Sequence, residues 1–89
     1  MAITRMVLDV LKPLEPSVLV LAERLSKLKG VSAVDIDVME LDRKVETVKI
    51  TLEGRNVGYD KVNAVLEKHG AVIHSLDRVT AGKRLTTPG

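Results

Sequence analysis

Hydrophobic and polar residues alternate along four stretches of this chain and recur at helical spacing along two others. The alternation predicts strands over residues 2–11, 31–41, 45–53 and 71–79. The first of these stretches carries Met6, Leu8 and Val10 on one parity, while Arg5 and Asp9 lie on the other. A spacing near 3.6 residues predicts helices over residues 16–30 and 59–70.

Proline and glycine mark the ends of the two predicted helices. Pro16 follows the break at "KPLEP" and suits the first turn of a helix, where a missing N–H costs nothing. Gly30 and Gly70 end the two periodic stretches. Glycine favours this place because it adopts the left-handed backbone that often follows a last helical turn.

The second and third strands are joined by the short link "DRK", which predicts an antiparallel hairpin. If Leu41 faces Val45, the paired residue numbers sum to 86. The predicted pairs are then Leu41–Val45, Val38–Val48, Asp37–Lys49 and Ile36–Ile50. A slip of one residue would bury the charged side chains, so this register is strongly specified.

The two halves of the chain repeat the order strand, helix, strand. A shift of 40 residues aligns "LKGVSAVDID" with "KHGAVIHSLD". This order predicts an α+β fold, the ferredoxin-like βαββαβ sandwich, in which a four-stranded antiparallel sheet carries two helices on one face. We expect one such domain over residues 1–80 and a flexible C-terminal tail over residues 81–89.

Most of the chain also resembles a known family, the small archaeal proteins classed as domain of unknown function 211. The resemblance rests on "VLDVLKPLEPSVLVLAERLSKLKGV", "VKITLEG" and "GAVIHSLDRV". It implies a ferredoxin-like fold and ring-like homo-oligomers, and it brings no established activity and no catalytic residues. Arg78 stands where the resemblance implies a further acid after "SLD".

Composition excludes several functional classes. Cysteine is absent, which excludes disulfides, thiolate metal sites and thiol chemistry. The net charge is only +2, and Tyr59 is the single aromatic residue, so the basic stripe and stacking platforms of nucleic-acid binders are missing. No apolar run is long enough to span a bilayer, and no secretion signal is present, so we expect a soluble, cytoplasmic protein without a membrane partner.

Asp35 and Asp37 are the candidate metal ligands. They are two residues apart on one strand, so their carboxylates point to the same face and suit a hard cation such as calcium. The alternative is a salt-bridged outer face, with Lys49 opposite Asp37 and Arg5 on a nearby strand. We favour this alternative, because a calcium ion needs more oxygen ligands than two carboxylates supply. No other cofactor is predicted.

The two histidines and the segment "GRN" at 54–56 are weaker candidates. The 40-residue shift maps His74 onto Val34, so we expect His74 to face the helices as a hydrogen-bonded core or margin residue. His69 ends the second helix, where a cation complements the helix dipole. "GRN" resembles the Arg and Asn with which acylphosphatases bind phosphate, but it follows the third strand instead of the first, so we reject a phosphate site.

The alternation of the second strand breaks near its end, at Met39 and Leu41. In the predicted fold this strand lies at the edge of the sheet, where pairing with another chain is easiest. Met39 and Leu41, together with Val7 and Leu11, are expected to make half of the outer face apolar. The break indicates either a β-bulge or a subunit contact, and we favour the contact as the homo-oligomer interface.

These observations favour a non-enzymatic homo-oligomeric protein of uncharacterised function that binds a small ligand or a cation at its subunit interfaces. One alternative is a regulatory domain of the ACT type, which binds a small effector near a glycine turn after the first helix; "LKGVSAVDID" fits that outline. The other is an enzyme with an unrecognised site. An enzyme needs convergent polar groups in a pocket, and no nucleophile–base pair stands at recognisable spacing.

Overall fold

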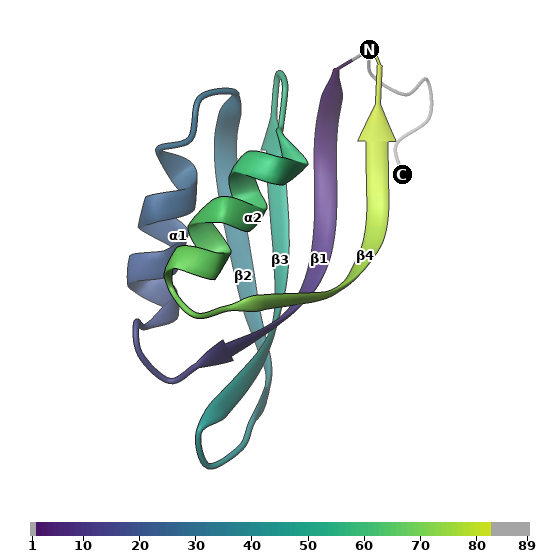
Figure 1. The fold of residues 1–89 in the computed structure, drawn as a ribbon. Helices are drawn as coiled ribbons and strands as arrows, with labels where there is room; N and C mark the ends of the chain where they lie inside the picture. The colour runs from purple at the N-terminus through teal and green to yellow at the C-terminus, as the bar shows by residue number, and fades with distance from the viewer. Residues whose placement is uncertain (1, 83–89) are drawn as a thin grey trace.

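Six elements form one antiparallel sheet with two helices on one of its faces (Figure 1). A computed structural model describes residues 2–82 of the chain. Its elements are β1 (Ile3–Pro13), α1 (Val18–Ser26), β2 (Val31–Leu41), β3 (Val45–Gly54), α2 (Tyr59–Lys68) and β4 (Val72–Ala81). The strand order is β2-β3-β1-β4, with every neighbouring pair antiparallel. The predicted ferredoxin-like α+β fold is confirmed.

Most of the predicted C-terminal tail, residues 81–89, lies outside the residues that the structure describes. β4 continues to Ala81, one residue past the predicted end of the domain. Residues 83–89 lie outside the described residues.

The hydrophobic core lies between the helices and the inner face of the sheet. It contains aliphatic side chains only, as the composition predicts: Met6, Leu8, Val10, Leu21, Leu25, Val48, Ile50, Leu52, Val57, Val62, Leu66 and Ala71. Each fully buried Leu, Ile or Val contributes about 1.5–3 kcal/mol. Each helix places two such residues in the core: Leu21 and Leu25 from α1, and Val62 and Leu66 from α2.

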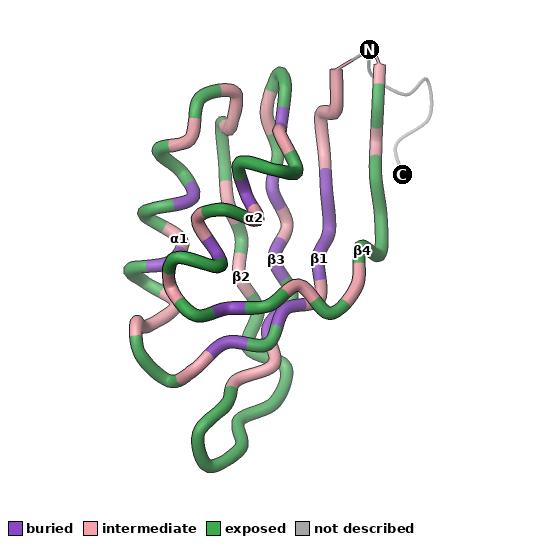
Figure 2. The backbone as a smooth tube through the Cα atoms, in the orientation of Figure 1, coloured by how far each residue is buried: buried purple, intermediate pink, exposed green. Residues whose placement is uncertain are grey.

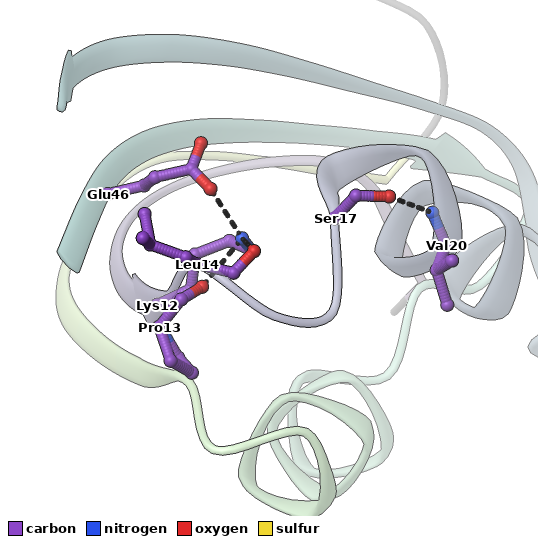
Figure 3. Close-up of polar contacts among 6 residues, drawn as sticks. All are labelled: Lys12, Pro13, Leu14, Ser17, Val20 and Glu46. Atoms are coloured by element: carbon purple, nitrogen blue, oxygen red, sulfur yellow. Dashed lines mark hydrogen bonds and ion pairs between the residues drawn. The ribbon is translucent and has the colours of Figure 1, made fainter. Parts of the chain in front are cut away.

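The start of α1 differs from the prediction by two residues. Ser17 is the N-cap, and its hydroxyl oxygen accepts a hydrogen bond from the backbone N–H of Val20 at 3.4 Å (Figure 3). Pro16 therefore precedes the cap and is not in the first helical turn. The serine decides the boundary because its side chain satisfies an amide that has no partner within the helix.

The two helix-ending glycines differ in position. Gly70 directly follows the C-cap of α2, His69, and has φ of +78°, as predicted. α1 ends earlier than predicted, at Ser26 with Lys27 as the C-cap. Gly30, with φ of +91°, instead closes the turn that connects α1 to β2.

The β2–β3 hairpin keeps the predicted register over most of its length. The pairs Val38–Val48, Asp37–Lys49 and Ile36–Ile50 form as predicted. Beyond Val38 the register shifts, so Leu41 lies opposite Glu46 and not Val45. Met39 is the extra residue, and the break in alternation is therefore a β-bulge. A subunit contact is not needed to explain the break.

β4 contains further irregularities, and one of them overturns the prediction for His74. β4 pairs with β1 through Val10–Ile73, Asp9–Ser75, Leu8–Leu76 and Val7–Arg78. His74 and Asp77 fall between paired residues, and both are exposed. Ile73 packs against the core instead of His74. The 40-residue shift fails here because one inserted residue reverses the side-chain parity of a strand.

The far end of the β2–β3 hairpin projects beyond the two helices, so the molecule is elongated, at 43 × 24 × 18 Å (Figure 2). Every residue from 37 to 45 is exposed. The opposite end of the molecule holds the turn after α1 and the loop between β3 and α2 (Figure 1).

Candidate functional site

The outer face of the sheet, opposite the helices, is lined by charged and hydroxyl side chains. The strand register arranges these side chains in rows that cross the sheet from β2 to β4. One row is Asp37, Lys49, Asp9 and Ser75, and the next is Asp35, Thr51, Val7 and Arg78. Lys49 lies opposite Asp37 as the register predicts, and Asp9 lies opposite Lys49 on its other side. None of the ion pairs of residues 2–82 joins Lys49 to either carboxylate, so the expected salt bridge between Asp37 and Lys49 is not formed.

Asp35 and Asp37 are both exposed and lie on the same face of β2, as predicted. Their cross-strand neighbours are Thr51 and Lys49, respectively. Within residues 2–82, no group of three or more His, Asp or Glu side chains is arranged to hold a metal ion. The cation site at these two carboxylates remains a prediction.

A hollow of about 400 Å³ lies on the same face, toward β4. Its basic groups are Arg5, Lys49 and Arg78, and Asp77 also lines it. The Nε of Arg5 lies 3.6 Å from the Glu53 carboxylate, which is an ion pair but too long for a hydrogen bond. This Nε is buried and has no hydrogen-bond partner among the described residues.

Three of the four predicted interface residues are accessible. Leu11, Met39 and Leu41 are 39%, 60% and 70% exposed, whereas Val7 is only 7% exposed and offers little contact area. The expected place of Leu41 on the outer face is wrong: because of the bulge, Leu41 shares the face of its partner Glu46, on the helix side of the sheet.

More apolar surface accompanies these residues than the sequence analysis anticipated. Val38 and Val45 are exposed on the projecting hairpin, near Met39 and Leu41. On the other edge of the sheet, β4 exposes Val72, Leu76 and Val79.

Lys12 and Glu46 form a buried ion pair that was not predicted from the sequence (Figure 3). The Lys12 ammonium donates hydrogen bonds to Glu46 Oε1 at 2.8 Å, to the Pro13 carbonyl at 2.7 Å and to the Leu14 carbonyl at 3.4 Å. Its side chain is 1% exposed. One signal was available, since Lys12 shares the inward parity of Met6, Leu8 and Val10.

All three protons of the Lys12 ammonium have acceptors, so the group has no donor left for a ligand. The cluster joins the end of β1 to the start of β3 and to the segment that leads into α1. We assign it a structural role.

The remaining polar groups form local contacts. The Nδ1 of His69 lies 2.8 Å from the Val65 carbonyl oxygen of its own helix. The Ser75 hydroxyl donates to Asp77 at 2.6 Å, across the irregular part of β4. Within residues 2–82, neither histidine is hydrogen-bonded to a hydroxyl or a carboxylate, so no Ser–His pair is formed. None of the described helices has the length and apolar character needed to cross a membrane.

Comparison with known proteins gives a family and a relative. Residues 4–88 match the model of a family described as DUF211, uncharacterized ArCR. The uncharacterized protein MJ0319 of Methanocaldococcus jannaschii is 43% identical to this chain over 83 residues, which are 93% of this chain and 86% of that protein. Neither description names an activity.

Proposed function

The chain belongs to the DUF211 family of uncharacterised proteins, and we propose that it is a non-catalytic protein that assembles with copies of itself through the two edges of its sheet. The observation that carries this proposal is the apolar surface on both edge strands. Met39 and Leu41 on β2, and Val72 on β4, are each at least 60% exposed. Long edge strands with exposed apolar side chains favour contact with another chain.

On the outer face of the sheet, the β2 edge and the β4 edge carry opposite charge. β2 contributes the carboxylates of Asp35, Asp37 and Glu40. On the β4 side, the guanidinium groups of Arg5 and Arg78 line the hollow. A second copy that places its β2 beside β4 of the first would bring these opposite charges together, which favours one arrangement over others.

Such a contact is heterologous, because β2 meets β4 and not another β2. Heterologous contacts build rings when the rotation between subunits closes. This supports the ring-like assembly that the family resemblance implies. The bulges in β2 and β4 interrupt the regular spacing of backbone groups, so we expect side-chain packing to dominate the contact.

Light scattering after size-exclusion chromatography tests the assembly. We expect the wild-type chain to have a mass several times its 9.7 kDa, and the double variant Met39→Glu/Leu41→Lys to have the mass of one chain. Exposed residues seldom affect folding, so the circular dichroism spectrum should not change. Leu19→Lys is the matched control, because Leu19 is 81% exposed but lies on α1 and not on either edge strand.

A wild-type chain that is monomeric at micromolar concentration contradicts the proposal. An unchanged mass in the double variant removes the end of β2 from the interface. If Leu19→Lys also dissociates the assembly, an added surface charge is enough to break it, and the result gives no evidence that the edge strands form the interface.

A further inference from the structure

At the end of the molecule opposite the hairpin, the turn after α1 packs against the loop between β3 and α2 (Figure 1). The backbone N–H of Asn56 donates to the Gly30 carbonyl at 3.3 Å. A Cβ on Gly30 would collide with the Asn56 carbonyl oxygen, and a Cβ on Gly54 would collide with the Gly30 carbonyl oxygen. The two backbone segments are therefore in direct contact, which is possible only with glycine at both positions.

A hollow of about 440 Å³ lies over this contact. It is lined by Gly30 and Asn56 and by three basic side chains, Lys29, Arg55 and Lys61. The three come from separate segments: the turn after α1, the loop after β3 and the first turn of α2. The fold thus brings Lys29 next to Arg55 and Lys61, which follow it in the chain by 26 and 32 residues.

These three cations have no carboxylate partner within the described residues. The ion pairs of residues 2–82 are Arg5–Glu53, Lys12–Glu46 and Lys27–Glu23. No carboxylate lines the hollow either. By contrast, Asp77 lines the basic hollow on the outer sheet face, and the groove lined by Arg24, Lys27 and Lys68 contains a lysine that is paired with Glu23.

Lys61 adds to the electrostatic cost of this arrangement. It lies in the first turn of α2, where the helix dipole disfavours a cation and favours the neighbouring Asp60. Its aliphatic chain packs back against Gly58, within 3.6 Å of where a Cβ would stand. A bound anion would offset both the repulsion among the three cations and the unfavourable interaction of Lys61 with the dipole.

We propose that this hollow binds a phosphate group, either as the free ion or on a small phosphorylated molecule. The guanidinium of Arg55 suits two phosphate oxygens at once, and Lys29 and Lys61 add point charges. The double negative charge of phosphate matches three cations better than a carboxylate does. The hollow is larger than a phosphate ion, so it has room for a small organic group.

The site differs from the phosphate loop that the sequence analysis considered and rejected. The rejected hypothesis was that "GRN" alone forms a phosphate loop like that of acylphosphatases, whose loop follows the first strand. Here Arg55 and Asn56 act together with lysines that precede β2 and begin α2. The site is complete in one copy of the chain, so it stands whether or not the chain assembles.

NMR titration of the ¹⁵N-labelled protein tests the proposal, with inorganic phosphate and glycerol 3-phosphate added at constant ionic strength against chloride. We expect saturable shifts of the Gly30 and Asn56 amides, with affinity about tenfold weaker in Arg55→Gln and in Lys61→Gln, since each removes a charge-assisted contact. Tighter binding of glycerol 3-phosphate identifies a phosphorylated molecule as the ligand, and tighter binding of inorganic phosphate identifies the free ion.

Lys44→Gln is the matched control, because it removes one exposed lysine from the hairpin link at the other end of the molecule. It should bind phosphate as the wild type does. Equal weakening in Lys44→Gln, or shifts that do not saturate, would overturn the proposal. The readout is separate from the assembly test, because Met39→Glu/Leu41→Lys should bind phosphate normally while Arg55→Gln keeps the wild-type mass.

Discussion

At the scale of single residues, the cost of burying Lys12 is met by three acceptors. An ammonium group removed from water requires a counter-charge and hydrogen bonds for all of its protons. Glu46 supplies the charge, and the carbonyls of Pro13 and Leu14 accept the remaining protons. The Glu46 side chain is also largely buried, with 13% exposed, but less completely than that of Lys12, with 1% exposed. Removing Glu46 therefore leaves the more deeply buried charge of the two without a partner.

This asymmetry predicts the result of breaking the pair. Glu46→Leu leaves the buried ammonium without a counter-charge and should lower the free energy of unfolding by about 3 kcal/mol. Lys12→Met/Glu46→Leu removes both charges and should lose less than the two single variants added together. Urea unfolding of the four proteins measures the coupling. Strict additivity would show that the two side chains do not stabilise each other.

At the scale of elements, bulges decide which face a side chain occupies. Val38 and Leu41 are separated by three positions, yet the bulge at Met39 puts both on the helix side of β2. In β4, the extra residue at His74 lets Ile73 point to the core and leaves the histidine exposed. Strand periodicity predicts faces only between such irregularities.

The turn that joins α1 to β2 permits a test with two matched glycines. Gly30→Ser should lower the free energy of unfolding by about 2 kcal/mol, because its φ of +91° is strained for other residues and Asn56 leaves no room for a Cβ. Gly58→Ser adds the same side chain where the nearest heavy atom lies at 3.6 Å, and serine is a better N-cap for α2.

We therefore expect Gly58→Ser to lower the free energy of unfolding by no more than about 0.5 kcal/mol, or to raise it. Thermal unfolding of the two variants beside the wild type gives the comparison. If both glycines accept serine equally well, the packing of Gly30 against Asn56 does not constrain the turn.

At the scale of the whole molecule, charge is distributed unequally between its surfaces. Carboxylates dominate the β2 side of the outer sheet face, where Asp35, Asp37 and Glu40 are exposed. Basic side chains gather at the end that holds the Gly30 turn. The acidic side suits either a basic surface of another copy or a divalent cation, and these two occupants respond differently to calcium.

Calcium titration of the melting temperature separates the two. We expect a flat response, since Asp35 and Asp37 supply too few oxygen ligands and Lys49 lies opposite Asp37. A calcium site would instead raise the melting temperature once the concentration passed its dissociation constant. Asp35→Asn/Asp37→Asn is the control: a rise in the wild type that this variant abolishes would establish the cation site at these carboxylates.

Local patterns in the sequence were sufficient for the order of the six elements, the sheet and the central register of the β2–β3 hairpin. Strand and helix periodicities arise from backbone geometry, which each segment carries within itself. The pairing of Ile36 with Ile50 followed from this periodicity and a short link. The exposure of Asp35 and Asp37 on one face of β2 could also be predicted from their parity, whereas the expected place of Leu41 on that face could not, because the bulge turns it to the helix side.

Only the tertiary structure decided that the break at Met39 is a bulge, that β4 has another at His74, and which distant residues meet. The bulges at Met39 and His74 depend on how one strand fits its neighbour, which no single segment records. Glu46 reaches Lys12 from 34 residues away, across neighbouring strands. Lys29, Arg55 and Lys61 line one hollow for a similar reason. Contacts of this kind are set by the packing of whole elements, since residues remote in the chain become neighbours only when the sheet and helices are assembled.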